Sequence, residues 1–126
     1  MLKNQETLFG IISTIFILLH TSMYILQDIY LKINSKNFKL AINKVLPSIS
    51  KLNTLSLLIA LTFTIPHIYY SNKKLTTFDS GYLLLFLLML STSTNLNFFK
   101  KFKLKQYSSI ISYLLTISLA VHVFFR

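Results

Sequence analysis

The sequence predicts an all-α, polytopic membrane protein with four transmembrane helices. Of the 126 residues, 53% are hydrophobic, and nearly all of the charge lies between four charge-free runs of 20 or 21 residues. A helix needs about 20 mainly apolar residues to cross a hydrocarbon core about 30 Å thick. We therefore expect residues 1–126 to form one membrane domain. The four predicted spans are Thr7–Gln27, Leu52–Asn72, Ser80–Phe99 and Gln106–Phe125.

The first run is predicted to be a retained span and not a cleaved signal. Only Lys3 and Glu6 carry charge before it, and no small-residue cleavage site follows it. Its 21 residues also exceed the roughly 7–15 apolar residues of a signal-peptide core.

Lysines set the predicted orientation. Two of the three loops are rich in lysine, whereas the middle loop has only Lys73 and Lys74, partly offset by Asp79. By the positive-inside rule, the two basic loops face the cytoplasm and both termini lie outside. Lysines at this surface attract anionic lipid headgroups, so the charge of +10 needs no nucleic acid partner. The lysines of the two loops are Lys32, Lys36, Lys39, Lys44 and Lys51, and Lys100, Lys101, Lys103 and Lys105.

The first of these loops is long enough for a short amphipathic helix before the second span. Phe38, Ala41, Ile42 and Val45 fall at helical spacing, with lysines on the other side, which is typical of a helix in the membrane interface. Pro47 is expected to end that helix. Spans two, three and four follow one another through short loops and are expected to pack as antiparallel hairpins.

Small residues four apart on two spans predict the faces where helices pack. Lipid provides no hydrophobic force between helices, so close contacts favour Gly, Ala, Ser and Thr. Gly10 and Thr14 offer a similar face on the first span. The predicted packing residues are Ser56, Ala60 and Thr64 on span two, and Ser112, Thr116 and Ala120 on span four.

Three histidines, His20, His67 and His122, lie within predicted spans. Ionisable groups inside a membrane are costly and often functional. From a rise of 1.5 Å per residue, His67 and His122 lie about 22 and 24 Å from the inner edge, and His20 lies about 10 Å from it. His67 and His122 are therefore the candidate ligands of one haem or metal ion. The alternative is that all three histidines are structural.

The sequence has few other residues that could form a catalytic or metal-binding site. Glu6, Asp28 and Asp79 are the only acidic side chains, so no paired-carboxylate site or metal cage is predicted, and the chain has no cysteine. The sequence also lacks a glycine-rich phosphate loop. Asp28 is expected to pair with a lysine at the inner interface. We predict that the protein is not an enzyme.

Lys44–Pro47 leads into the apolar Leu57–Leu61, and Leu75, Thr76 and Gly81 are followed by the lysine-rich loop and a final apolar helix. In this layout the chain resembles the SirB family of small four-helix bacterial inner-membrane proteins. The family's Pro-His motif is replaced here by Pro47-Ser48, so its polar intramembrane positions do not carry over. The resemblance implies where the protein is located and which helical scaffold it has, and it implies little about the mechanism.

The predicted function is therefore that of a SirB-like, non-enzymatic accessory or interaction protein, partnered by another membrane protein or by itself. One alternative is a b-haem or metal-binding membrane protein that uses His67 and His122. A second alternative is a small transporter or pore, built as an oligomer because four helices enclose little space alone.

Overall fold

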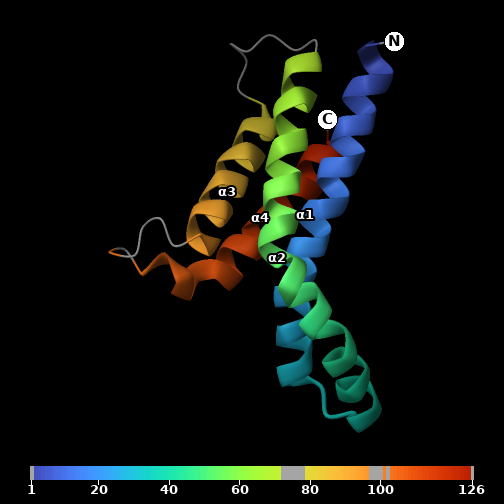
Figure 1. Cartoon of the computed structure of the whole chain (residues 1–126), viewed down its shortest axis with the longest axis vertical. Coiled ribbons are helices and arrows are strands. Elements are labelled where there is room, and N and C mark those ends of the chain that lie inside the picture. Colours follow the sequence, from blue (N-terminus) through green and yellow to red (C-terminus); the bar gives the residue numbers. More distant parts are fainter. Residues whose placement is uncertain (1, 72–78, 97–100, 102, 126) are drawn as a thin grey trace.

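The computed structural model describes residues 2–71, 79–96, 101 and 103–125, and its regular elements are all helices (Figure 1). The predicted all-α class is confirmed. The 3-10 helix η2 is a single short turn that leads into the last helix. The elements are α1 (Leu2–Lys32), α2 (Lys36–Tyr70), α3 (Ser80–Asn95), η2 (Leu104–Tyr107) and α4 (Ser108–Phe124).

Helices α1 and α2 form a long antiparallel hairpin. They contain 31 and 35 residues, which corresponds to lengths of about 46 and 52 Å. Both are long and apolar enough to cross a membrane, over Lys3–Lys32 and Lys36–Tyr70. Figure 1 shows that the turn between them lies well beyond the ends of α3 and α4.

The prediction that Pro47 ends a separate amphipathic helix is wrong. The predicted segment and the second span form one continuous helix, with Pro47 and Pro66 inside it. Proline removes one hydrogen bond and crowds the preceding turn, but packing on both sides can hold the helix together. Ile42 is buried before Pro47, and Asn53 is buried after it. Figure 1 shows α2 changing direction between its blue-green and green parts, as expected for a proline-containing helix.

Helices α3 and α4 are shorter than the predicted third and fourth spans. They contain 16 and 17 residues, about 24 and 26 Å of helix. Helix α3 ends at Asn95, and residues 97–99 of the predicted span lie outside the described residues. Helix α4 begins at Ser108 because Gln106 and Tyr107 belong to η2.

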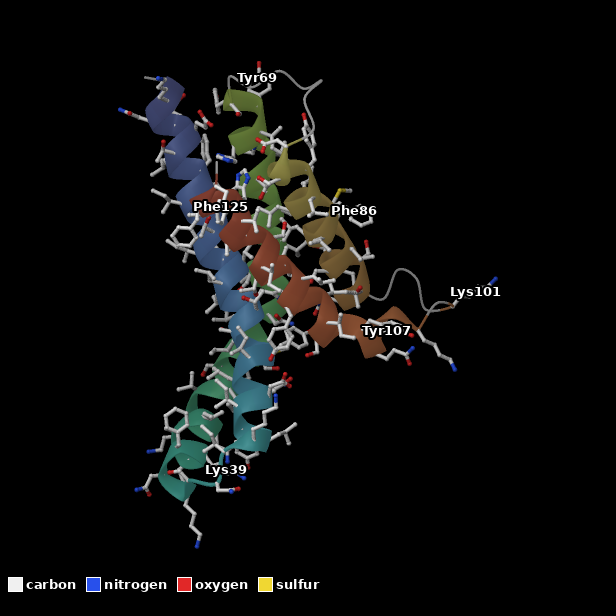
Figure 2. The ribbon with its side chains drawn as sticks, turned by 180° about the vertical axis from the view of Figure 1, so that it is seen from behind. Lys39, Tyr69, Phe86, Lys101, Tyr107 and Phe125 are labelled. Carbon is white, nitrogen blue, oxygen red and sulfur yellow. The ribbon has the colours of Figure 1, made fainter. Side chains whose placement is uncertain are left out.

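Each helix gives one large, fully buried aliphatic side chain to the centre of the bundle. These are Ile17, Leu57, Leu88 and Leu115, from α1, α2, α3 and α4 in turn. The opposite faces carry exposed apolar side chains, among them the labelled Phe86 in Figure 2. A bundle that is apolar outside as well as inside is typical of a protein surrounded by lipid.

The predicted packing residues of span two all lie inside the bundle: Ser56, Ala60 and Thr64 are buried. The predicted packing residues of span four differ in burial: Ser112 is buried, Thr116 is half-buried and Ala120 is exposed. Helix α4 crosses the bundle so that its buried side runs through Leu115 and Leu119, which turns Ala120 outward.

Candidate functional site

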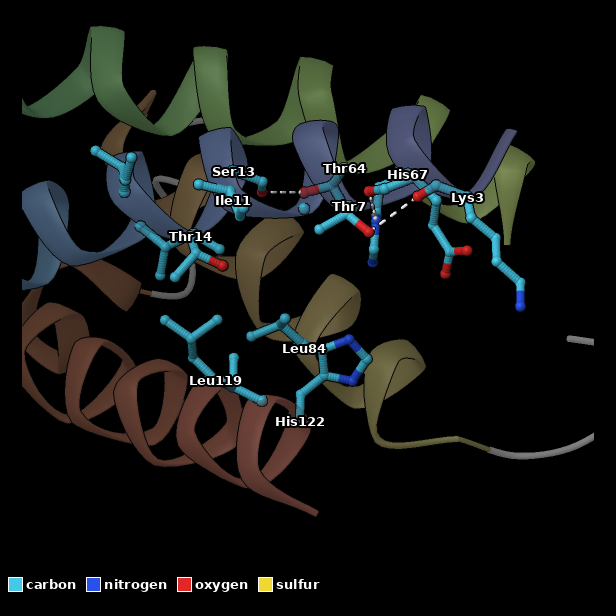
Figure 3. A pocket seen from close by; sticks show the side chains of 15 residues that line it. Lys3, Thr7, Ile11, Ser13, Thr14, Thr64, His67, Leu84, Leu119 and His122 are labelled. Atoms are coloured by element: carbon cyan, nitrogen blue, oxygen red, sulfur yellow. Dashed lines mark hydrogen bonds between the residues drawn. The ribbon is translucent and has the colours of Figure 1, made fainter. Parts of the chain in front are cut away.

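The structure brings His67 of α2 and His122 of α4 together, although 55 residues separate them in the sequence. Their ring centroids are 6.3 Å apart, and the two ring planes are nearly perpendicular, at 88°. Figure 3 shows the two imidazoles pointing toward one another across an open space. This agrees with the similar depth predicted for the two residues.

Helix α1 fixes the orientation of His67. Its Nδ1 atom lies 2.8 Å from the backbone oxygen of Glu6. Because a carbonyl only accepts hydrogen bonds, Nδ1 carries the hydrogen and Nε2 has the lone pair that can bind a metal. A Cβ atom added to Gly10 would lie 2.9 Å from Cε1 of this ring, so only glycine leaves room for it.

His122 is held in a similar way by the start of α3. Its Nδ1 atom lies 3.0 Å from the hydroxyl of Ser80, and that hydroxyl donates to Asp79 over 3.1 Å. A Cβ atom on Gly81 would lie 3.1 Å from Cε1 of His122. The two glycines of the chain thus each provide space for one of the two histidines.

A cavity of about 480 Å³ adjoins the histidine pair and is lined by all four helices. Its apolar wall is formed by Ile17, Leu84 and Leu119. Lys3 and Glu6 line the cavity toward the N-terminal end of α1, and Figure 3 shows the Lys3 side chain at the side of the cavity. Volumes of about 300–1,000 Å³ are usual for sites that bind small molecules and cofactors.

Two hydroxyls between α1 and α2 close one side of the cavity. The Ser13 and Thr64 oxygens are 2.6 Å apart, and both hydroxyls also lie within hydrogen-bonding distance of the Ala60 carbonyl. The packing face predicted for span two therefore joins the two helices and also forms part of the cavity wall.

A second polar cluster, which the sequence analysis missed, surrounds His20. This side chain is fully buried, and its Nδ1 atom is hydrogen-bonded to Oδ1 of Asn53. Its Nε2 atom lies 3.0 Å from the Ser91 hydroxyl and 3.4 Å from that of Ser112. Asn53 also donates to Oδ1 of Asn95 over 3.0 Å. One residue or more from every helix takes part.

The protonation pattern of this cluster follows from its partners. Oδ1 of Asn53 can only accept, so His20 donates from Nδ1. In a neutral imidazole Nε2 then accepts from a serine hydroxyl, so both ring nitrogens have partners within the protein. Asn53 and Asn95 are polar residues in charge-free runs, and like His20 they lie nearer the predicted inner ends of those runs. This pattern was the signal in the sequence that could have indicated the cluster.

Asp28 has a different partner from the one predicted. Its carboxylate accepts a hydrogen bond from the hydroxyl of Tyr113, so α4 holds it in place of a lysine. Within the described residues, no group of three or more His, Cys, Asp or Glu side chains is arranged to hold a metal ion.

Comparison with known proteins finds no protein-family model, no curated protein and no solved structure that matches the chain. The resemblance to the SirB family stays a prediction that rests on the residues given above.

Proposed function

We propose that the protein is a small, non-enzymatic integral membrane protein that binds a haem through His67 and His122. The observation that carries the proposal is the facing pair of imidazoles beside a cavity lined by four helices. Haem is the cofactor class that suits a two-histidine donor set, because the porphyrin nitrogens fill the other positions around the iron.

The separation of the rings supports this choice. An imidazole nitrogen binds a transition metal at about 2.0–2.1 Å, so two rings whose centroids lie 6.3 Å apart leave room for one ion that both residues could hold. The bonds from Nδ1 to Glu6 and Ser80 are those expected to orient such ligands.

When bound, haem supplies reversible one-electron chemistry. The part of this chain would be to hold the group with the two imidazoles, to fix the His67 ring through the bond from Nδ1 to Glu6, and to line the site with the apolar side chains of Ile17, Leu84 and Leu119. Their apolar character lowers the local dielectric and limits access of water, two of the means by which a protein tunes the potential of a haem.

The first test is the reduced-minus-oxidised absorption spectrum of the detergent-purified full chain after haem titration. We expect one haem per chain, with sharp bands in the reduced form, and we expect His67→Ala and His122→Ala each to abolish the six-coordinate spectrum. Added imidazole should restore it in part, because the cavity remains when a ring is removed. His20→Gln is the matched control and should keep the spectrum, since His20 lies outside the cavity lining. A folded wild-type chain that binds no haem would overturn the proposal.

We also propose that all four helices span a bacterial inner membrane with both termini outside. Helices α1 and α2 are sufficiently long and apolar to do so. Helices α3 and α4 are shorter, but the buried leucines Leu88 and Leu115 pack them against the long hairpin.

Reporter fusions test this topology. A fusion after Asn34 and one after Lys105 should be cytoplasmic, because each follows an inward-running span, whereas a fusion after Lys74 should be external. If only α1 and α2 cross the membrane, the fusions after Lys74 and Lys105 will report the same side. That result would reject the four-span topology while leaving the hairpin intact.

A second candidate function is a SirB-like accessory or interaction protein without a cofactor. It is favoured by the hydrogen bonds that His67 and His20 already make within the chain. It predicts a colourless protein in which His67→Ala has no functional effect apart from stability, and a partner that is recovered by crosslinking in the membrane.

A further inference from the structure

The end of the α1–α2 hairpin projects beyond the other two helices. Figures 1 and 2 show this part, which carries the labelled Lys39, at the opposite end of the molecule from Tyr69. We call residues 23–52 the basic hairpin. Met23 and Ile42 are buried within it, and Lys39 lies 5.2 Å above the ring of Tyr30. The hairpin is therefore a packed structure that continues past the bundle.

The charge of the basic hairpin is almost entirely positive. Its one acidic side chain, Asp28, accepts a hydrogen bond from Tyr113. Lys39 is half-buried and the other four lysines are exposed. The lysines are Lys32, Lys36, Lys39, Lys44 and Lys51. A surface with this charge is complementary to an anionic one.

An exposed apolar stripe accompanies these lysines. Phe38, Val45 and Leu52 are 50%, 49% and 45% exposed, and they recur every seven residues. At 100° per residue, the three side chains fall within an arc of about 40° on α2. Lys36, Lys44 and Lys51 fall within about 80° on another side of the same helix. The exposed Leu40 also lies on this basic side, whereas the apolar stripe carries no lysine. An apolar stripe beside a basic side is typical of a helix at the membrane interface.

We propose that the basic hairpin rests on the anionic lipid surface of the inner leaflet. The stripe of Phe38, Val45 and Leu52 contacts the border between acyl chains and headgroups, and the exposed lysines contact the phosphates. Charge complementarity favours lipid over a second copy of the chain, because another copy would bring five like-charged lysines to the same face. The proposal rests on the membrane location proposed above but not on haem binding.

The chain has no tryptophan, so a single substitution gives an unambiguous fluorescent reporter. The full chain carrying Val45→Trp would be placed in lipid nanodiscs, either zwitterionic or containing 30% anionic phosphatidylglycerol. We expect emission at shorter wavelength in the anionic discs, and quenching by lipids brominated near the headgroup to be at least twofold stronger there. Replacing Lys36, Lys44 and Lys51 with glutamine should remove this difference.

Two further reporters separate the possible failures. Asn43→Trp lies about 160° from the stripe on α2 and should be quenched little in either disc. Phe86→Trp, on the outward face of α3, should be quenched in both. If Phe86→Trp is quenched and Val45→Trp is not, the inference about the basic hairpin is wrong while the membrane location stands. If neither is quenched, the membrane location itself is wrong. Equal quenching of Val45→Trp in both discs would also overturn the role of anionic lipid.

Discussion

Replacement of Asn53 by leucine is expected to lower the free energy of unfolding by about 1–2 kcal/mol. Asn53 accepts from His20 and donates to Asn95, so its loss leaves two polar groups without these partners. Asn53 is buried, so water cannot readily replace it. Hydrogen bonds between helices in a membrane are modest on average, and the larger part of the effect comes from the unsatisfied His20 Nδ1 and Asn95 Oδ1 atoms.

The measurement is unfolding of the purified protein in mixed micelles, followed by far-ultraviolet circular dichroism. Asn43→Leu is the matched control, because it makes the same chemical change on an exposed face of the same helix. Combining Asn53→Leu with His20→Leu should cost less than the sum of the single changes, because the lost bond between these two residues is then counted once and only Asn95 Oδ1 still lacks its donor. An Asn53→Leu protein as stable as Asn43→Leu would show that the cluster contributes nothing to stability.

Substitution of Gly10 by alanine is expected to weaken haem binding at least tenfold. In an open helical position, this change would stabilise the helix by up to about 1 kcal/mol. Here the new methyl group would lie 2.9 Å from Cε1 and 3.0 Å from Nδ1 of His67. A shift of the ring away from this methyl group would lengthen or break its bond to the Glu6 carbonyl. The substitution should therefore move the proposed ligand and cancel the gain in helix stability.

Haem titration of Gly10→Ala measures the loss of haem affinity, and unfolding of the same variant measures the change in stability. Gly81→Ala should have the weaker effect of the two, because its methyl group would approach His122 only to 3.1 Å. Ala41→Val adds a larger side chain at an exposed position of α2 and serves as the control for added bulk. A Gly10→Ala protein that is stabilised and keeps its haem affinity would show that His67 is not confined as the structure indicates.

The histidine pair shows which features of the candidate site can be predicted from the sequence. Equal depth of His67 and His122 followed from counting residues along two runs that end on the same side. Depth says nothing about rotation around a helix axis. That the two rings face each other depends on Gly10 and Gly81, whose missing side chains allow α1 and α3 to approach the rings.

The cluster around His20 could not be derived by the same counting. Measured from the inner ends of the predicted spans, His20 and Asn53 differ in depth by roughly 9 Å, yet their side chains are hydrogen-bonded. The inner ends of the two charge-free runs, in α1 and α2, therefore do not lie opposite one another in the packed hairpin. Lysine can extend along a helix and keep its ammonium group in water, so the position of a lysine marks the membrane edge only loosely.

The sequence by itself determined the helical class, the apolar runs within α1 and α2 and the segregation of lysines, because hydrophobic runs and charge are local properties of the chain. It did not determine that α2 continues through Pro47, that Ala120 points outward, or that Asn53 meets His20. These outcomes depend on side chains from helices far apart in sequence, which pack in one register because burying Ile17, Leu57, Leu88 and Leu115 together leaves few alternatives. Only the tertiary structure decided which polar groups share the interior.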